Sequence, residues 1–78
     1  MRKKELRLVV TFASTHNAMK MERVCRKNEV PGRLIPVPLQ ISAGCGLCFS
    51  APPEAKQQVL DTMEQNELEP EQVLEMEI

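Results

Sequence analysis

The stretch LRLVVTFASTHNAMKMERVC, residues 6–25, passes directly from a strand pattern to a helix pattern. In residues 6–12 every second residue is apolar, which predicts a strand with one buried face. Residues 14–17 (STHN) are of types that favour helix N-termini. Apolar residues then recur at helical spacing, so we expect a helix that runs to about Asn28. The proline and glycine at residues 31–32 end it and turn the chain.

The rest of the chain repeats this alternation of strand and helix patterns. Residues 33–37 predict a short strand, which Pro36 places at a sheet edge because proline donates no hydrogen bond to a neighbouring strand. Residues 47–50 predict a third strand. A second helix is expected over residues 52–66, since prolines are tolerated in a first helical turn. Alternating residues 73–78 predict a last strand.

The resulting order, β-α-β-β-α-β, is the split βαβ pattern of ferredoxin-like folds. It predicts an α+β two-layer sandwich in which two helices cover one face of a four-stranded antiparallel sheet. In this topology the third strand lies between the first two. Another two-layer sandwich with a different strand order, such as the fold of small sulfur-carrier proteins, is the alternative. A chain of 78 residues is expected to form a single domain, residues 1–78.

Charge and hydropathy exclude several classes of protein. The net charge is −1, so no overall electrostatic attraction to nucleic acid is expected. No apolar run approaches the roughly 20 residues of a membrane span, and the basic start has no signal-peptide pattern. We therefore expect a cytoplasmic protein, in which disulfides are rarely structural. No phosphate-binding loop or catalytic triad is recognisable, so a stand-alone enzyme is not indicated.

The three cysteines differ in their surroundings. Cys45 lies between Gly44 and Gly46, which predicts an exposed loop thiol. Cys48 is expected on the sheet face away from the helices, and Cys25 in the core. A Cys-x-x-Cys redox pair usually begins a helix, whereas this one leads into a strand, and a zinc site needs four ligands. Redox and metal-binding roles are therefore weaker alternatives, and no metal or cofactor is expected.

The predicted topology brings two distant segments to one end of the sheet. The first two strands run parallel, so residues 14–17 and the turn that contains Cys45 should lie close together. A helix N-terminus favours a nearby anion such as a thiolate. His16 is expected either to cap the helix or to tune that thiolate. The uncovered sheet face should have a mildly apolar centre, suited to a protein partner or a homodimer, made by Val9, Leu34, Cys48 and Val73.

The chain from residue 11 to residue 49 resembles the selenium/sulfur carrier-like family of small bacterial domains. The pattern of this family is Phe-x-Ser-Thr-x-x-Ala-x-x-x-Glu, then Leu-Ile-Pro-x-Pro-Arg, then Ser-x-x-Cys-Gly. The matching residues are Phe12, Ser14, Thr15, Ala18, Glu22, Ile35, Pro36, Pro38, Ser42, Cys45 and Gly46. Leu39 stands where the family often has arginine, which removes a group that would stabilise a bound anion or thiolate.

The resemblance implies a carrier that accepts sulfur or selenium on Cys45 as a persulfide or selenopersulfide and passes it to a partner enzyme. Cys48 is then a resolving thiol. The expected partners are a protein donor, such as a cysteine desulfurase, and a protein acceptor, with no nucleic acid and no membrane; the chain itself is a monomer or a homodimer. The binding residues expected around the thiol are Ser14, Thr15, His16, Pro38, Ser42, Gly44 and Gly46. A non-catalytic interaction module is the competing class.

Overall fold

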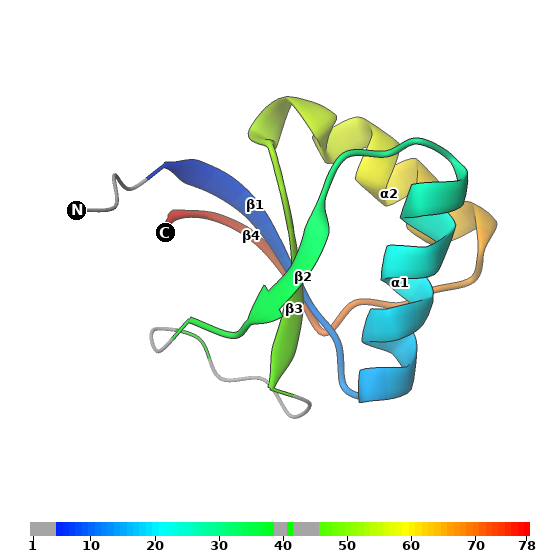
Figure 1. The fold of residues 1–78 in the computed structure, drawn as a ribbon, viewed down its shortest axis with the longest axis horizontal. Coiled ribbons are helices and arrows are strands. Elements are labelled where there is room, and N and C mark those ends of the chain that lie inside the picture. Colours follow the sequence, from blue (N-terminus) through cyan, green and yellow to red (C-terminus); the bar gives the residue numbers. More distant parts are fainter. Residues whose placement is uncertain (1–4, 39–40, 42–45) are drawn as a thin grey trace.

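The computed structural model describes residues 5–38, 41 and 46–78. Its elements follow the predicted order: β1 (Leu6–Thr11), α1 (Thr15–Lys27), β2 (Arg33–Pro36), β3 (Leu47–Ala51), the 3₁₀ turn η1 (Pro53–Ala55), α2 (Lys56–Gln65) and β4 (Gln72–Glu77). All strand pairs are antiparallel, and the sheet order is β2-β3-β1-β4. Both helices cover one face of the sheet (Figure 1). The predicted α+β class is confirmed, and β2 is an edge strand, as Pro36 indicates.

The two helices end in the same way, in a tripeptide of Asn, Glu and an aliphatic residue. Glu29 and Glu67 follow the last turns with positive φ angles of 58° and 55°. The next amide, of Val30 or Leu68, reaches back to the carbonyl of Cys25 or Met63 at 2.8 Å. This is the Schellman arrangement, which satisfies carbonyl groups that a helix end leaves without partners. Val30 and Leu68 are both buried, so each helix end is fastened to the core.

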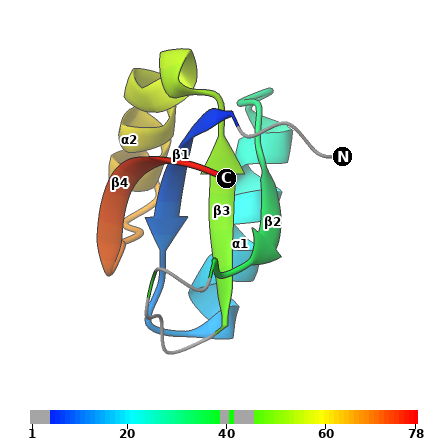
Figure 2. The same ribbon diagram turned by 90° about the vertical axis from the view of Figure 1, so that its left-hand side faces the viewer.

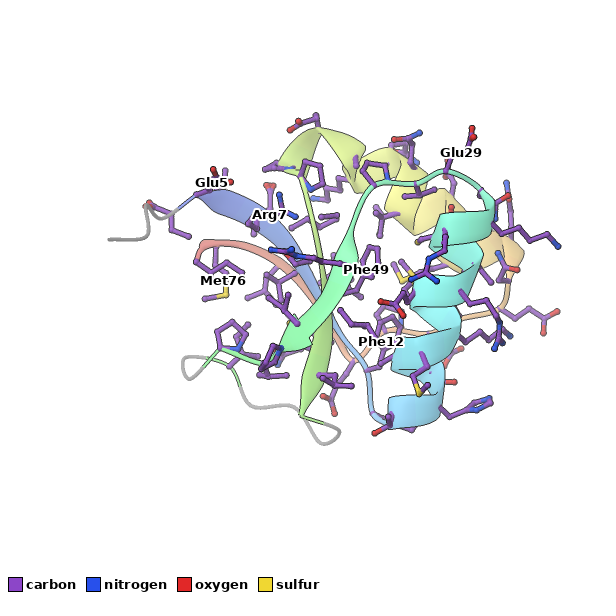
Figure 3. All side chains as sticks on the ribbon, in the orientation of Figure 1. Glu5, Arg7, Phe12, Glu29, Phe49 and Met76 are labelled. Atoms are coloured by element: carbon purple, nitrogen blue, oxygen red, sulfur yellow. The ribbon has the colours of Figure 1, made fainter. Side chains whose placement is uncertain are left out.

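The core lies between the sheet and the helices. Phe12 and Phe49 are fully buried there, and Figure 3 shows both rings between the strands and α1. The buried residues of α1 fall on one stripe, namely Ala18, Met21, Val24 and Cys25. The thiol of Cys25 donates to the sulfur of Met21 at 3.9 Å, which confirms Cys25 as a core residue. No helix in the described part of the chain is both long and apolar enough to cross a membrane.

The strand register defines the second face of the sheet, called here the open face. Residues directly opposite in antiparallel strands share a face. The open face therefore contains Arg33 and Ile35 of β2, Cys48 and Ser50 of β3, Arg7, Val9 and Thr11 of β1, and Gln72, Leu74 and Met76 of β4. Figure 2 views the sheet from this side, with α1 behind it.

The register confirms two of the four residues predicted for the open face and corrects the other two. Val9 and Cys48 lie on it, as expected. Leu34 pairs with Phe49, and Val73 packs against the core cluster, so both face the helices. Their places on the open face are taken by the neighbouring residues of the same strands.

Candidate functional site

The described residues that the sequence predicts for the site lie at one end of the sheet. Thr11, the last residue of β1, pairs with Cys48 near the start of β3. The chain leaves β1 at Thr11 and enters α1 only four residues later, after the N-cap Ser14. The start of β3 and the start of α1 therefore lie at the same end of the sheet, at the bottom of Figure 1. We call this end the rim.

The N-terminus of α1 gives the rim a partly positive character. The Ser14 hydroxyl accepts a hydrogen bond from the Asn17 amide at 3.2 Å. The helix cap therefore lies within the predicted segment, residues 14–17, and Ser14 provides it. A helix leaves its first N–H groups without acceptors inside the helix, and its dipole favours an anion there. The first turn of α1 contains no acidic residue that would neutralise this end. Thr15 and His16 occupy that turn with exposed side chains.

The connection between β2 and β3 begins and ends next to the rim. The Val37 amide donates to the Gly46 carbonyl at 3.1 Å, which joins its two ends. The Ile41 amide donates to the Pro38 carbonyl at 3.0 Å, and Pro38 is half-buried. Gly46 is exposed and has a φ of +78°, a conformation that favours glycine. The other residues assigned to this connection lie outside the described residues, namely Leu39, Ser42, Gly44 and Cys45.

Cys48 lies on the predicted face but is completely buried, with 0% of its surface exposed. It is flanked by Thr11 on β1 and by Ile35 on β2. Burial hinders attack by a dissolved reagent, because a thiol reacts through its exposed thiolate. Cys48 is therefore poorly suited to act first on an incoming substrate.

Thr11 is a rim residue that the sequence analysis did not select. Its side chain is fully buried, and its Oγ1 is the buried side-chain oxygen without a hydrogen-bond partner in the described part of the chain. Its carbonyl, by contrast, accepts from the Glu71 amide at 2.7 Å. The alternation in β1 already indicated a polar residue on the open face, but its lack of a partner is visible only in the structure.

A second polar group missed by the sequence analysis lies further along the open face. The Arg7 Nε donates to the Ser50 hydroxyl at 3.0 Å, across 43 residues of sequence. Arg33 stands directly opposite Ser50 on β2. Ser50 is buried, with 3% exposed, whereas Arg33 is exposed and Arg7 half-buried. Ser50 is therefore bonded to one arginine side chain and stands opposite a second arginine in the register.

Cys25 is separate from both groups. It lies in the core with 1% of its surface exposed, and burial raises the pKa of its thiol from 9.0 to about 11. Removing a thiolate from water is unfavourable, so this thiol stays protonated at neutral pH. Cys25 is therefore a packing residue and not a nucleophile.

The described residues contain no group of three or more His, Cys, Asp or Glu side chains arranged to hold a metal ion. A groove of about 420 Å³ lies between the C-terminal parts of the two helices and is lined by Arg23, Val24, Lys27, Asn28, Gln65 and Asn66. It is at the opposite end of α1 from Ser14, so it is not continuous with the rim.

The fold and the rim define a small two-layer α+β domain with a cysteine-containing connection between its second and third strands. The family model described as "Putative Se/S carrier protein-like" matches residues 7–75, and the chain belongs to this family. The match extends over nearly all the described elements, well beyond the segment whose motifs resemble the family. No curated protein and no solved structure matches the chain.

Proposed function

We propose that the protein carries sulfur or selenium in the cytoplasm as a persulfide or selenopersulfide on Cys45. Family membership is the observation that carries the proposal. Cys45 has glycine on both sides in the sequence, so neither neighbour has a side chain that could cover the thiol. The acid-free N-terminus of α1 at the rim supports a thiolate in its vicinity. A carrier of this kind needs a reactive thiol and a surface for its partners, and no further catalytic group.

The loading step is a transfer between two thiols. The donor, for example a cysteine desulfurase, presents an enzyme persulfide, R–S–SH. The Cys45 thiolate attacks the outer sulfur, the S–S bond of the donor breaks, and the products are Cys45–S–SH and the donor thiol R–SH. No oxidant is needed, because the sulfur bond is exchanged and not created. An acceptor enzyme removes the outer sulfur by the reverse type of attack.

Cys48 is proposed as a resolving thiol. Its attack on the Cys45 persulfide forms a Cys45–Cys48 disulfide and releases hydrogen sulfide. Because Cys48 is fully buried in β3, this reaction requires a local opening of the strand. Burial thus slows the loss of carried sulfur, and we expect resolution to be slow compared with delivery to an acceptor.

Mass spectrometry of the loaded chain tests the proposal. After incubation with a cysteine desulfurase and free cysteine, the wild-type protein should gain the mass of one sulfur atom, mapped to the peptide that contains Cys45. Reductant should remove it, and Cys45→Ser should prevent it. Cys48→Ser should retain the added sulfur longer, and Cys25→Ser should leave it unchanged. A Cys45 that stays unmodified and alkylates no faster than Cys25 would refute the carrier role.

An interaction module without carrier chemistry is the second candidate. The observation that favours it is the apolar character of the open face, where Ile35, Leu74 and Met76 are only half-buried. In that case the protein should bind a partner equally well with Cys45 replaced by serine, and no sulfur should be acquired.

A further inference from the structure

The open face is more apolar than is usual for a sheet face that is exposed to solvent. Antiparallel sheets with one solvated face normally carry polar residues on it. Here Val9 of β1 is fully buried, and Ile35 of β2 and Leu74 and Met76 of β4 are half-buried. Figure 3 shows Met76 on the side of the sheet away from the helices. Partly exposed apolar groups gathered on one face indicate a surface that a partner covers.

Among the strand residues that define this face, the charged side chains are Arg7 and Arg33, and both are positive. Arg7 donates to the Ser50 hydroxyl, and Arg33 stands opposite Ser50 on β2. The ion pair among the described residues is Glu22–Arg26 on α1, so neither Arg7 nor Arg33 has an acidic partner there. Glu5, at the end of the sheet beyond Arg7, is exposed and makes no ion pair with it.

These charges decide which occupant fits the open face. A second copy stacked face to face would present two further arginines and no carboxylate among the residues that define the face, so it offers no charge complementarity. Nucleic acid would place phosphates against Ile35, Leu74 and Met76, whose side chains have neither a positive charge nor a hydrogen-bond donor. A protein surface that combines apolar side chains with a carboxylate satisfies both features, because guanidinium groups bind carboxylates in bidentate geometry.

We propose that the open face is the docking surface for the sulfur-donating enzyme, and that Arg7 and Arg33 receive a carboxylate of that enzyme beside Ser50. This inference rests on the proposed function for the identity of the partner. The connection that contains Cys45 leaves the open face at Val37 and returns to it at Gly46, whose backbone groups are hydrogen-bonded to each other. In Figure 1 the green segment directly after β2 runs away from the helices, on the side of the open face. A donor seated there adjoins the connection that carries the accepting cysteine.

The test measures docking and carrying separately. Binding of a purified cysteine desulfurase is measured by calorimetry with the Cys45→Ser chain, which cannot carry a persulfide. Loading of the chain with an unaltered Cys45 is measured with the desulfurase and, in parallel, with sodium polysulfide, which needs no docking surface. Arg33→Glu is the test variant because Arg33 is exposed at a sheet edge. Arg23→Glu, the same change at an exposed position of α1, is the matched control.

Arg33→Glu should weaken desulfurase binding about ten-fold and lower the ratio of desulfurase loading to polysulfide loading by a similar factor. Arg23→Glu should change both by less than about two-fold, and added salt should weaken binding of the chain with both arginines intact. Equal effects of the two variants, or no desulfurase binding at low salt, would overturn the docking proposal. Polysulfide that fails to load Cys45 would instead overturn the carrier role, whatever the binding result.

Discussion

The open face contains residues whose burial stabilises the fold and one residue, Thr11, whose burial does not. Val9 and Cys48 are buried as apolar packing requires, whereas Thr11 buries a hydroxyl without a partner. Such a group costs about 1–3 kcal/mol of stability, because it loses its hydrogen bonds to water. A residue that lowers stability at a fully buried position is unusual, so the effect of removing the Thr11 hydroxyl on stability is informative.

Thr11→Val should raise the free energy of unfolding by about 1 kcal/mol, since valine has nearly the same shape and no hydroxyl to bury. Thr11→Ser, which keeps the hydroxyl and loses the methyl group, should lower it. Urea denaturation of the three proteins measures both changes. A destabilised valine variant would show that the hydroxyl has a partner, such as a buried water molecule.

At the scale of elements, most of the secondary structure could be predicted because periodicity and capping residues are local properties. The predicted helix and strand bounds differ from the observed ones by a few residues, and the short turn η1 replaces the predicted first turn of the second helix. The face of Leu34 could not be predicted, because it depends on pairing with Phe49 on a strand that is distant in sequence. The burial of Cys48 is likewise set by neighbouring strands and not by the Cys-x-x-Cys spacing.

The passage from α1 into β2 depends on Gly32. Its φ is +147°, and an added Cβ atom would overlap the ring of Phe49 and lie 2.9 Å from the Ser50 carbonyl. Phe49 is fully buried and cannot move aside freely. Gly32→Ala should therefore lower the free energy of unfolding by about 2–4 kcal/mol, through backbone strain and overpacking together.

Gly46→Ala provides the matched control for this prediction. Gly46 also has a positive φ, of +78°, but an added Cβ would meet no atom of the described residues within 4 Å. Its substitution should lower the free energy of unfolding by only about 1 kcal/mol. Equal losses in the two variants, measured by urea denaturation, would show that the contact with Phe49 contributes nothing.

The whole molecule places its three thiols in three environments. The sheet order brings Cys48 between two strands, the layer of helices encloses Cys25, and the sequence puts Cys45 in the connection between β2 and β3. The α+β class and the start of the first helix within residues 14–17 could be predicted from the sequence. The pairing of Arg7 with Ser50 could not, because it joins residues 43 positions apart through the strand order.

Because the Cys25 thiol is buried, we expect the stability of the whole domain to fall at alkaline pH. Folding raises its pKa from 9.0 to about 11, so the folded state keeps the proton while the unfolded chain releases it. The contribution is fully present below pH 9 and is lost as the pH rises toward 11. The free energy of unfolding should fall over this range by about 2 kcal/mol more in the wild type than in Cys25→Ala. All other residues are the same in the two proteins, so the difference between the two chemical denaturation series isolates Cys25. Parallel pH profiles would show that Cys25 titrates as an ordinary exposed thiol and that the core around α1 admits water.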